Sequence, residues 1–288
     1  MRLTSRRLAE DESMWLIGPS ADRDVVGHSW VERMAAQLGG HTSVGPDHGL
    51  LSSLTDLAGS EFDPTKVDPR IADFYEHTTR WRMDLWSQWS AYAWPFGAMI
   101  TALFSRRLQQ LSLPMRPLDV SYGMDSSVVH VHDKDASVVG AAWLRNMRKT
   151  GTTTYSGLYG SQTLPGSIQP SVRVVFPLPL GSVQVFLRPS VDGRGGLHLH
   201  SPLGRFGSDG AYLVLPRGSV LNARRIPIAE HFHLFVDEDG NVRADHSLKL
   251  WRIPAVQLHY RMRRDPVLCS HHTGEMRSYA ASAAADAP

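Results

Sequence analysis

Short runs of alternating or β-branched residues, separated by turn residues, fill the chain from Pro117 onward. This texture is typical of strands and constrains the fold more than any other feature. No helical stretch separates the runs, which disfavours parallel βαβ units and favours antiparallel neighbours. The candidate strands are 126–132, 138–147, 152–159, 171–177, 182–188, 196–200, 211–215, 219–226, 229–236, 242–251 and 255–262.

Two helices are predicted before these strands. Asp68 and Pro69 are a typical N-cap and first helical residue. An aromatic stripe follows at helical spacing and is better explained as a core face than as a cofactor site. The stripe consists of Ile71, Phe74, Tyr75, Thr78, Trp81, Leu85 and Trp89. Pro95 interrupts it, and a second helix is expected from Phe96 to about Leu113.

We therefore predict an α+β fold in which N-terminal helices pack against a curved antiparallel β-sheet or a partly open β-barrel, lipocalin-like or START-like. Residues 68–265 are expected to form the main domain, with a cavity for a small ligand. Residues 1–67 are expected to be an N-terminal arm with one short helix, beginning near the capping-box pattern Ser29 to Glu32. That arm either packs on the main domain or a second subunit, or is a disordered leader. Residues 266–288 are expected to be disordered.

The composition excludes several classes of protein. Basic residues are scattered and the net charge is only +2, so nucleic-acid binding is not expected. A single cysteine, Cys269, excludes an intramolecular disulfide and fits the cytoplasm. No secretory signal is readable. The longest apolar stretch, 91–104, is too short to span a membrane.

The segment Glu230 to Trp251 is predicted to be a β-hairpin around Asp239 and Gly240. Alternation places His231, His233 and Phe235 on one face. If Asp239 and Gly240 form a two-residue turn, His233 lies opposite His246 and the three histidines share that face. One added bulge residue would move one strand's side chains to the other face.

Candidate catalytic residues are the titratable groups of this hairpin and of the aromatic helix. They are His231, His233, His246, Asp245, Glu230, Glu76 and His77. A histidine–carboxylate pair in an apolar cavity can transfer a proton near neutral pH. Each group alone is slightly better explained as a surface residue, whereas the cluster as a whole favours a site. The aromatic candidates for ligand contact are Tyr75, Trp81, Trp86, Phe235 and Trp251.

Three His-x-His pairs, at 130/132, 198/200 and 231/233, each project two imidazoles from one side of a strand. Metalloenzymes with β-barrels present ligands in this way, but a third ligand is not evident beyond His246 or Asp245. Ordinary strand histidines are favoured and no metal ligand is assigned. No dinucleotide-binding or P-loop motif occurs, so no cofactor is expected.

Three segments resemble uncharacterised, chiefly actinobacterial, YndJ-like proteins. They are Phe74 to Thr78 with the tryptophans that follow, Leu103 to Pro114, and the hairpin 230–251. The resemblance covers roughly residues 68–262. It implies no mechanism and no functional residue.

The leading functional hypothesis is a cofactor-independent enzyme, a cyclase or isomerase, that acts on a hydrophobic small molecule in secondary metabolism. One alternative is a non-catalytic lipid- or small-molecule-binding protein that uses the same cavity. Another is a metal-dependent oxygenase that uses the His-x-His pairs. A homodimer is possible in each case.

Overall fold

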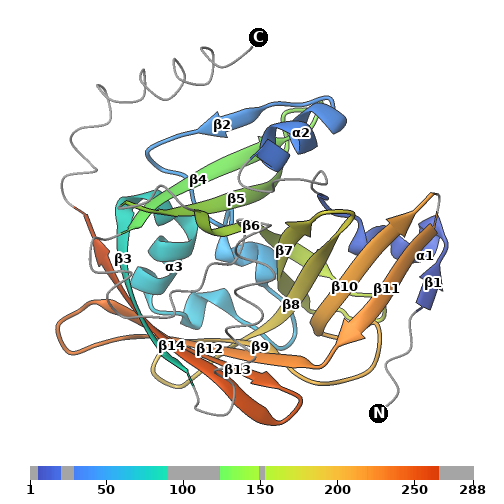
Figure 1. The fold of residues 1–288 in the computed structure, drawn as a ribbon. Coiled ribbons are helices and arrows are strands. Elements are labelled where there is room, and N and C mark those ends of the chain that lie inside the picture. Colours follow the sequence, from blue (N-terminus) through green and yellow to red (C-terminus); the bar gives the residue numbers. More distant parts are fainter. Residues whose placement is uncertain (1–5, 21–28, 90–123, 149–152, 219, 266–288) are drawn as a thin grey trace.

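The computed structural model describes residues 6–20, 29–89, 124–148, 153–218 and 220–265 (Figure 1). The described strands are β1 Arg6–Leu8, β2 Thr42–Val44, β3 Trp81–Trp89, β4 Met124–His132, β5 Val138–Met147, β6 Thr153–Thr163, β7 Pro170–Leu178, β8 Gly181–Val191, β9 Leu197–Ser201, β10 Gly210–Arg217, β11 Val220–Ile226, β12 Ile228–Val236, β13 Val242–Leu250 and β14 Ile253–Arg264. The α-helices are α1 Glu10–Ser13, α2 Ser29–Gln37 and α3 Pro69–Glu76. The 3-10 helices are η1 Met14–Leu16, η2 Leu54–Leu57, η3 Pro64–Lys66 and η4 Thr78–Arg80.

These strands make one 14-stranded antiparallel sheet with the order β2-β4-β5-β6-β7-β8-β9-β12-β13-β14-β3. Strand β8 also pairs with β10, which continues through β11 to β1 and forms a branch. The sheet curves around α3, and its end strands β2 and β3 do not pair with each other (Figure 1). The predicted α+β class and the β-barrel are therefore wrong: the described chain is a predominantly β fold with an open sheet.

Each of the eleven predicted strands is present, with ends shifted by a few residues. Turn residues separate them as expected, and every pairing between neighbours is antiparallel. Three strands were missed. Strands β1 and β2 have three residues each, which is too short to show a pattern.

The third missed strand, β3, corrects the helix prediction. The helix that begins at Asp68 ends at Glu76, and the Trp81 segment pairs with β14 instead. Trp81 and Leu85 lie four residues apart, a spacing that puts two side chains on one face of a helix and also of a strand. Met83, midway between them, lines the interior, as the strand period requires. The second predicted helix, 96–113, lies outside the described residues, as do Cys269 and 266–288.

The described parts of residues 1–67 pack against the sheet. Trp30 is almost fully buried in a cluster with Val131 and Val175, and its indole N–H donates to Ser156 Oγ at 2.8 Å. Trp15 packs at the branch, edge-on to Tyr212. The segment 50–67 supplies leucines to the main core beside α3.

No helix within the described ranges is both long enough and apolar enough to cross a bilayer.

Candidate functional site

An apolar cavity of about 360 Å³ lies between α3 and the concave face of the sheet. Strands β5–β14 and β3 supply its wall because alternate residues of each strand point inward. Most of the wall is aliphatic or aromatic; examples are Phe176, Val185, Leu187, Leu199, Phe232 and Leu258. Pockets of this kind bind small molecules when a few polar groups converge on them.

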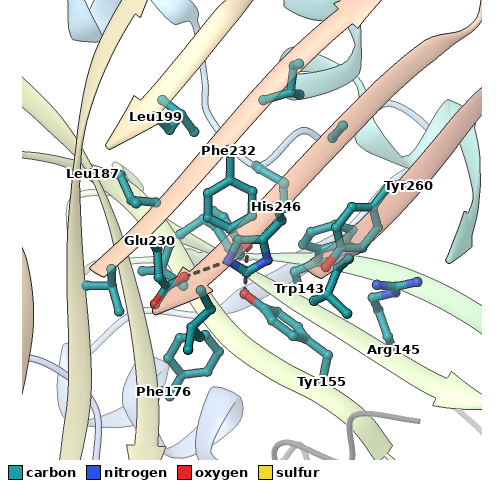
Figure 2. Close-up of a pocket in the computed structure, with 18 of the residues that line it drawn as sticks. Trp143, Arg145, Tyr155, Phe176, Leu187, Leu199, Glu230, Phe232, His246 and Tyr260 are labelled. Atoms are coloured by element: carbon teal, nitrogen blue, oxygen red, sulfur yellow. Dashed lines mark hydrogen bonds and ion pairs between the residues drawn. The ribbon is translucent and has the colours of Figure 1, made fainter. Parts of the chain in front are cut away.

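The polar groups of this cavity centre on a carboxylate–imidazole pair. His246 Nε2 lies 3.0 Å from Glu230 Oε2, and the two side chains are only 10% and 14% exposed (Figure 2). The ring of His246 stacks on Phe232, with centroids 3.7 Å apart. The other ring nitrogen, Nδ1, is buried and has no hydrogen-bond partner among the described residues. A buried polar atom of this kind is costly unless something binds it.

Three tyrosines and an arginine join this pair at the cavity wall (Figure 2). The hydroxyls of Tyr155 and Tyr159 lie 2.7 Å apart. Burial raises the pKa of Tyr155 well above its usual range and the pKa of Tyr260 to about 12. These hydroxyls therefore stay protonated at neutral pH and can donate hydrogen bonds. Burial also lowers the pKa of Arg145.

The loop of the hairpin decides which histidine enters the cavity. Residues 237–241 separate the last strand pair, Val236 and Val242. Gly240 adopts a φ of 80° and its N–H donates to Asp237 O at 2.9 Å; such a left-handed residue is typical of a bulged turn. The prediction of His233 opposite His246 is therefore wrong by one residue: Phe232 pairs with His246 and His233 with Asp245.

His231, His233 and Asp245 consequently lie on the outer face of the sheet, away from the cavity. There Asp245 pairs with His259 at 2.7 Å, and both are about half exposed. Glu76 and His77 lie elsewhere. Glu76 accepts hydrogen bonds from Ser53 Oγ and from the backbone N–H of Leu54, at 3.0 and 2.7 Å, and so orders the start of η2. His77 forms a half-exposed pair with Asp47.

The aromatic candidates are also dispersed. Tyr75 lines the cavity, whereas Trp81 is buried in the core and donates its indole N–H to Asp73 at 3.0 Å. Trp86 and Trp251 are about half exposed. Phe235 lies beside His233 on the outer face.

Sequence reasoning missed four cavity groups: Arg145, Tyr155, Tyr159 and Tyr260. Each lies in a predicted strand, and the four-residue spacing of Tyr155 and Tyr159 places them on one face. The sequence alone does not show which face of β5 points inward, because this strand has buried apolar residues on both faces: Ala142 and Trp143 are both buried.

A second cluster of titratable groups lies on the outer face of β9 and β12. It consists of His198, His200, His231 and His233, with Asp192 beside them. Burial, and then the neighbouring imidazoles, lower the pKa values of His198, His200 and His231; the value for His231 falls to about 4. A hydrogen bond from the Gly196 N–H lowers the pKa of Asp192. Nitrogen ligands of this type suit a transition metal.

The chain is similar in sequence to a curated bacterial protein. The chain is 29% identical over 214 residues to a Bacillus subtilis protein named uncharacterized membrane protein YndJ. The match covers 74% of this chain but 37% of that protein, so the chain spans little more than a third of its length. It supports the YndJ-like resemblance. No family model and no solved structure matches the chain.

Neither the fold nor the similar protein supports the expectation of a cyclase or isomerase. That expectation relied on an apolar cavity with convergent polar groups and on the lack of a cofactor motif, and these features do not specify a reaction. The name of the similar protein states no activity.

Proposed function

We propose that this chain binds a small, mostly apolar molecule in its internal cavity and holds one polar group of that molecule at Glu230 and His246. The observation that carries the proposal is the buried pair itself, in a mostly apolar wall, with His246 Nδ1 lacking a hydrogen-bond partner in the described part of the chain. A ligand that donates a hydrogen bond to Nδ1, and buries its apolar part against the wall, would satisfy both features.

The surroundings of the pair favour an amphipathic ligand. The tyrosine hydroxyls and Arg145 lie among the polar groups, while β7 and β8 supply aliphatic side chains such as Val174 and Val183. A ligand with one polar end and an apolar body would match this division.

A second candidate function is acid–base catalysis on such a ligand. The specific observation in its favour is the 3.0 Å carboxylate–imidazole contact. A carboxylate that accepts the Nε2 proton fixes the imidazole tautomer, leaving Nδ1 as a base toward a bound molecule. In this reading Glu230 is a positioning residue and His246 the catalytic residue.

Cytoplasmic location and homodimer formation stay predictions that cell fractionation and light scattering would test.

Binding is tested with the apolar fluorescent probe N-phenyl-1-naphthylamine. We expect the wild-type chain to enhance its emission, with energy transfer from tryptophan. Ala244 lines the cavity and is almost fully buried, so Ala244→Phe should occupy ligand space and weaken binding at least about tenfold, or about 1.4 kcal/mol.

The matched control is Leu203→Phe, which adds an aromatic ring at an exposed position. This variant should bind the probe like the wild type. Equal binding by both variants would show that the probe binds outside the cavity, and the proposal would fail. Native mass spectrometry then separates the two functions: a co-purified molecule released unchanged supports binding alone, and conversion that His246→Phe abolishes supports catalysis.

A further inference from the structure

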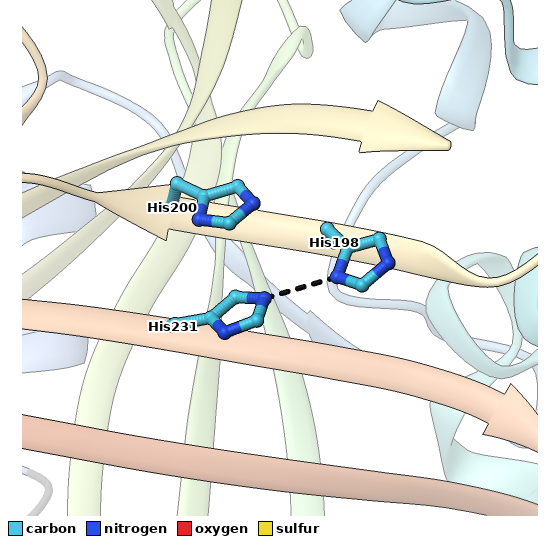
Figure 3. Close-up of side chains that lie close together, drawn as sticks. All are labelled: His198, His200 and His231. Atoms are coloured by element: carbon cyan, nitrogen blue, oxygen red, sulfur yellow. Dashed lines mark hydrogen bonds between the residues drawn. The ribbon is translucent and has the colours of Figure 1, made fainter. Parts of the chain in front are cut away.

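The outer face of β9 and β12 brings two His-x-His pairs together. The strands are antiparallel, and His200 pairs with His231 while His198 pairs with His233. Residues two apart in a strand share a face, so the four imidazoles form a compact group. The rings of each cross-strand pair are stacked, with centroids 4.2 Å apart. His198 and His231, which belong to different cross-strand pairs, also contact each other diagonally (Figure 3).

Three of these rings place nitrogen atoms close to one another. His198 Nδ1 and His231 Nε2 are 3.0 Å apart, and one nitrogen of His200 completes a set whose atoms all lie within 4.8 Å of one another (Figure 3). In a tetrahedral zinc site with Zn–N bonds of about 2.0–2.1 Å, ligand nitrogens lie about 3.3 Å apart. Turning the imidazoles out of their stacked arrangement would bring the three nitrogens to coordination distance.

Asp192 is placed to orient this set. Its Oδ2 lies 3.4 Å from His198 Nε2, the nitrogen on the far side of the ring from His231. Its Oδ1 accepts the backbone N–H groups of Arg194 and Gly196 at 2.7 and 2.9 Å, which fixes the carboxylate in the β8–β9 turn. Metal-binding histidines commonly donate their other N–H to such a carboxylate, which sets the tautomer.

We propose that His198, His200 and His231 bind one divalent transition-metal ion, with Zn²⁺ as the preferred ion, and that Asp192 is the positioning residue for His198. Imidazole nitrogens suit Zn²⁺, Cu²⁺ and Ni²⁺ and bind Mg²⁺ and Ca²⁺ poorly. Three protein ligands leave a fourth position for water or an external ligand. The site is separate from the cavity because the side chains of β9 and β12 that line the cavity, such as Leu199 and Phe232, point to the opposite face.

The test uses the full chain without a histidine tag. Zn²⁺ is titrated calorimetrically, and Co²⁺ is added separately because its visible absorption reports tetrahedral nitrogen coordination. One equivalent of either ion is expected. His198→Ala, His200→Ala and His231→Ala should each remove the Co²⁺ spectrum and weaken zinc binding by more than about tenfold, and Asp192→Asn should weaken it about 10- to 100-fold.

The matched control is His259→Ala, which removes an exposed histidine from the same face of the sheet. It should leave zinc affinity and the Co²⁺ spectrum unchanged. Thermal unfolding of each metal-free variant shows whether lost binding is lost folding. A Co²⁺ spectrum that survives in a folded His200→Ala or His231→Ala variant, or binding that depends on His233 instead, would overturn the assignment. Failure here would leave the cavity proposal untouched, because the probe assay needs none of these residues.

Discussion

Replacing both members of the Glu230–His246 pair with leucine should restore the stability that replacing one of them removes. In His246→Leu the Glu230 carboxylate keeps its buried position and loses the group that pairs with it at 3.0 Å. Removal of one partner from a buried pair costs about 3–5 kcal/mol. In the double variant Glu230→Leu/His246→Leu neither position carries a charge, and such replacements of a whole buried pair are often neutral or stabilising by about 1–4 kcal/mol.

The assay is equilibrium urea unfolding at pH 7.5, followed by tryptophan fluorescence and circular dichroism. We expect the single variant to lose about 3 kcal/mol, which is more than a hundredfold in the folding equilibrium. The double variant should return to the wild-type free energy of unfolding or exceed it, while losing the probe affinity of the cavity. This combination would show that the pair serves binding at the expense of stability.

The exposed pair Asp245–His259 is the matched control. Its atoms are closer, at 2.7 Å, but both side chains are about half exposed. Exposed pairs contribute about 0–1 kcal/mol, so His259→Leu should change the free energy of unfolding by no more than about 1 kcal/mol. The reasoning is refuted if the double variant is as unstable as the single one, or if His246→Leu costs no more than His259→Leu.

Three further predictions concern stability. Burial lowers the pKa values of His48 and His130 below 6.5, so the unfolded chain takes up their protons first. The contribution of these two histidines to the free energy of unfolding is therefore complete above about pH 6.5 and is lost as the pH falls below that value. In urea titrations, His130→Gln should reduce the loss of this free energy between about pH 7 and pH 5. An unchanged pH dependence would exclude His130 as its source. Gly240→Ala, at a φ of 80°, should cost about 1–2 kcal/mol, and a neutral result would show that the loop adopts another turn. Trp30→Ala should cost about 3–5 kcal/mol because Trp30 is almost fully buried; a loss below about 1 kcal/mol would mean that α2 is not part of the cooperative fold.

The strands were predictable because each is defined locally, by alternation and by the turn residues at its ends. The arrangement of the sheet was not. The pairing of β3 with β14 joins segments about 180 residues apart, and no local pattern encodes a partner at that distance. The branch at β8, where one strand serves both β9 and β10, is equally invisible in the sequence.

Only part of the candidate site could be predicted, because the rest depends on contacts between strands that are distant in sequence. Glu230 and His246 were both chosen, but with His231 and His233 as their neighbours. The choice between the faces depended on one loop residue, since Gly240 in the left-handed region adds a bulge that a two-residue turn lacks. Tyr155 and Arg145 come from strands far from the hairpin in sequence, and only the curvature of the sheet brings them beside it.

The alternation of β12 has a consequence for how this protein can change over time. Along that strand Glu230, Phe232 and Leu234 line the interior, and His231 and His233 between them belong to the histidine group outside. Even and odd positions of this strand thus belong to different candidate sites. Substitutions at even positions can remodel what the interior accepts without disturbing the imidazoles, and the reverse also holds. A one-residue deletion in the loop 237–241 is different: by shifting β13 against β12 it would remove His246 from the interior and bring it to the face that carries the histidine group.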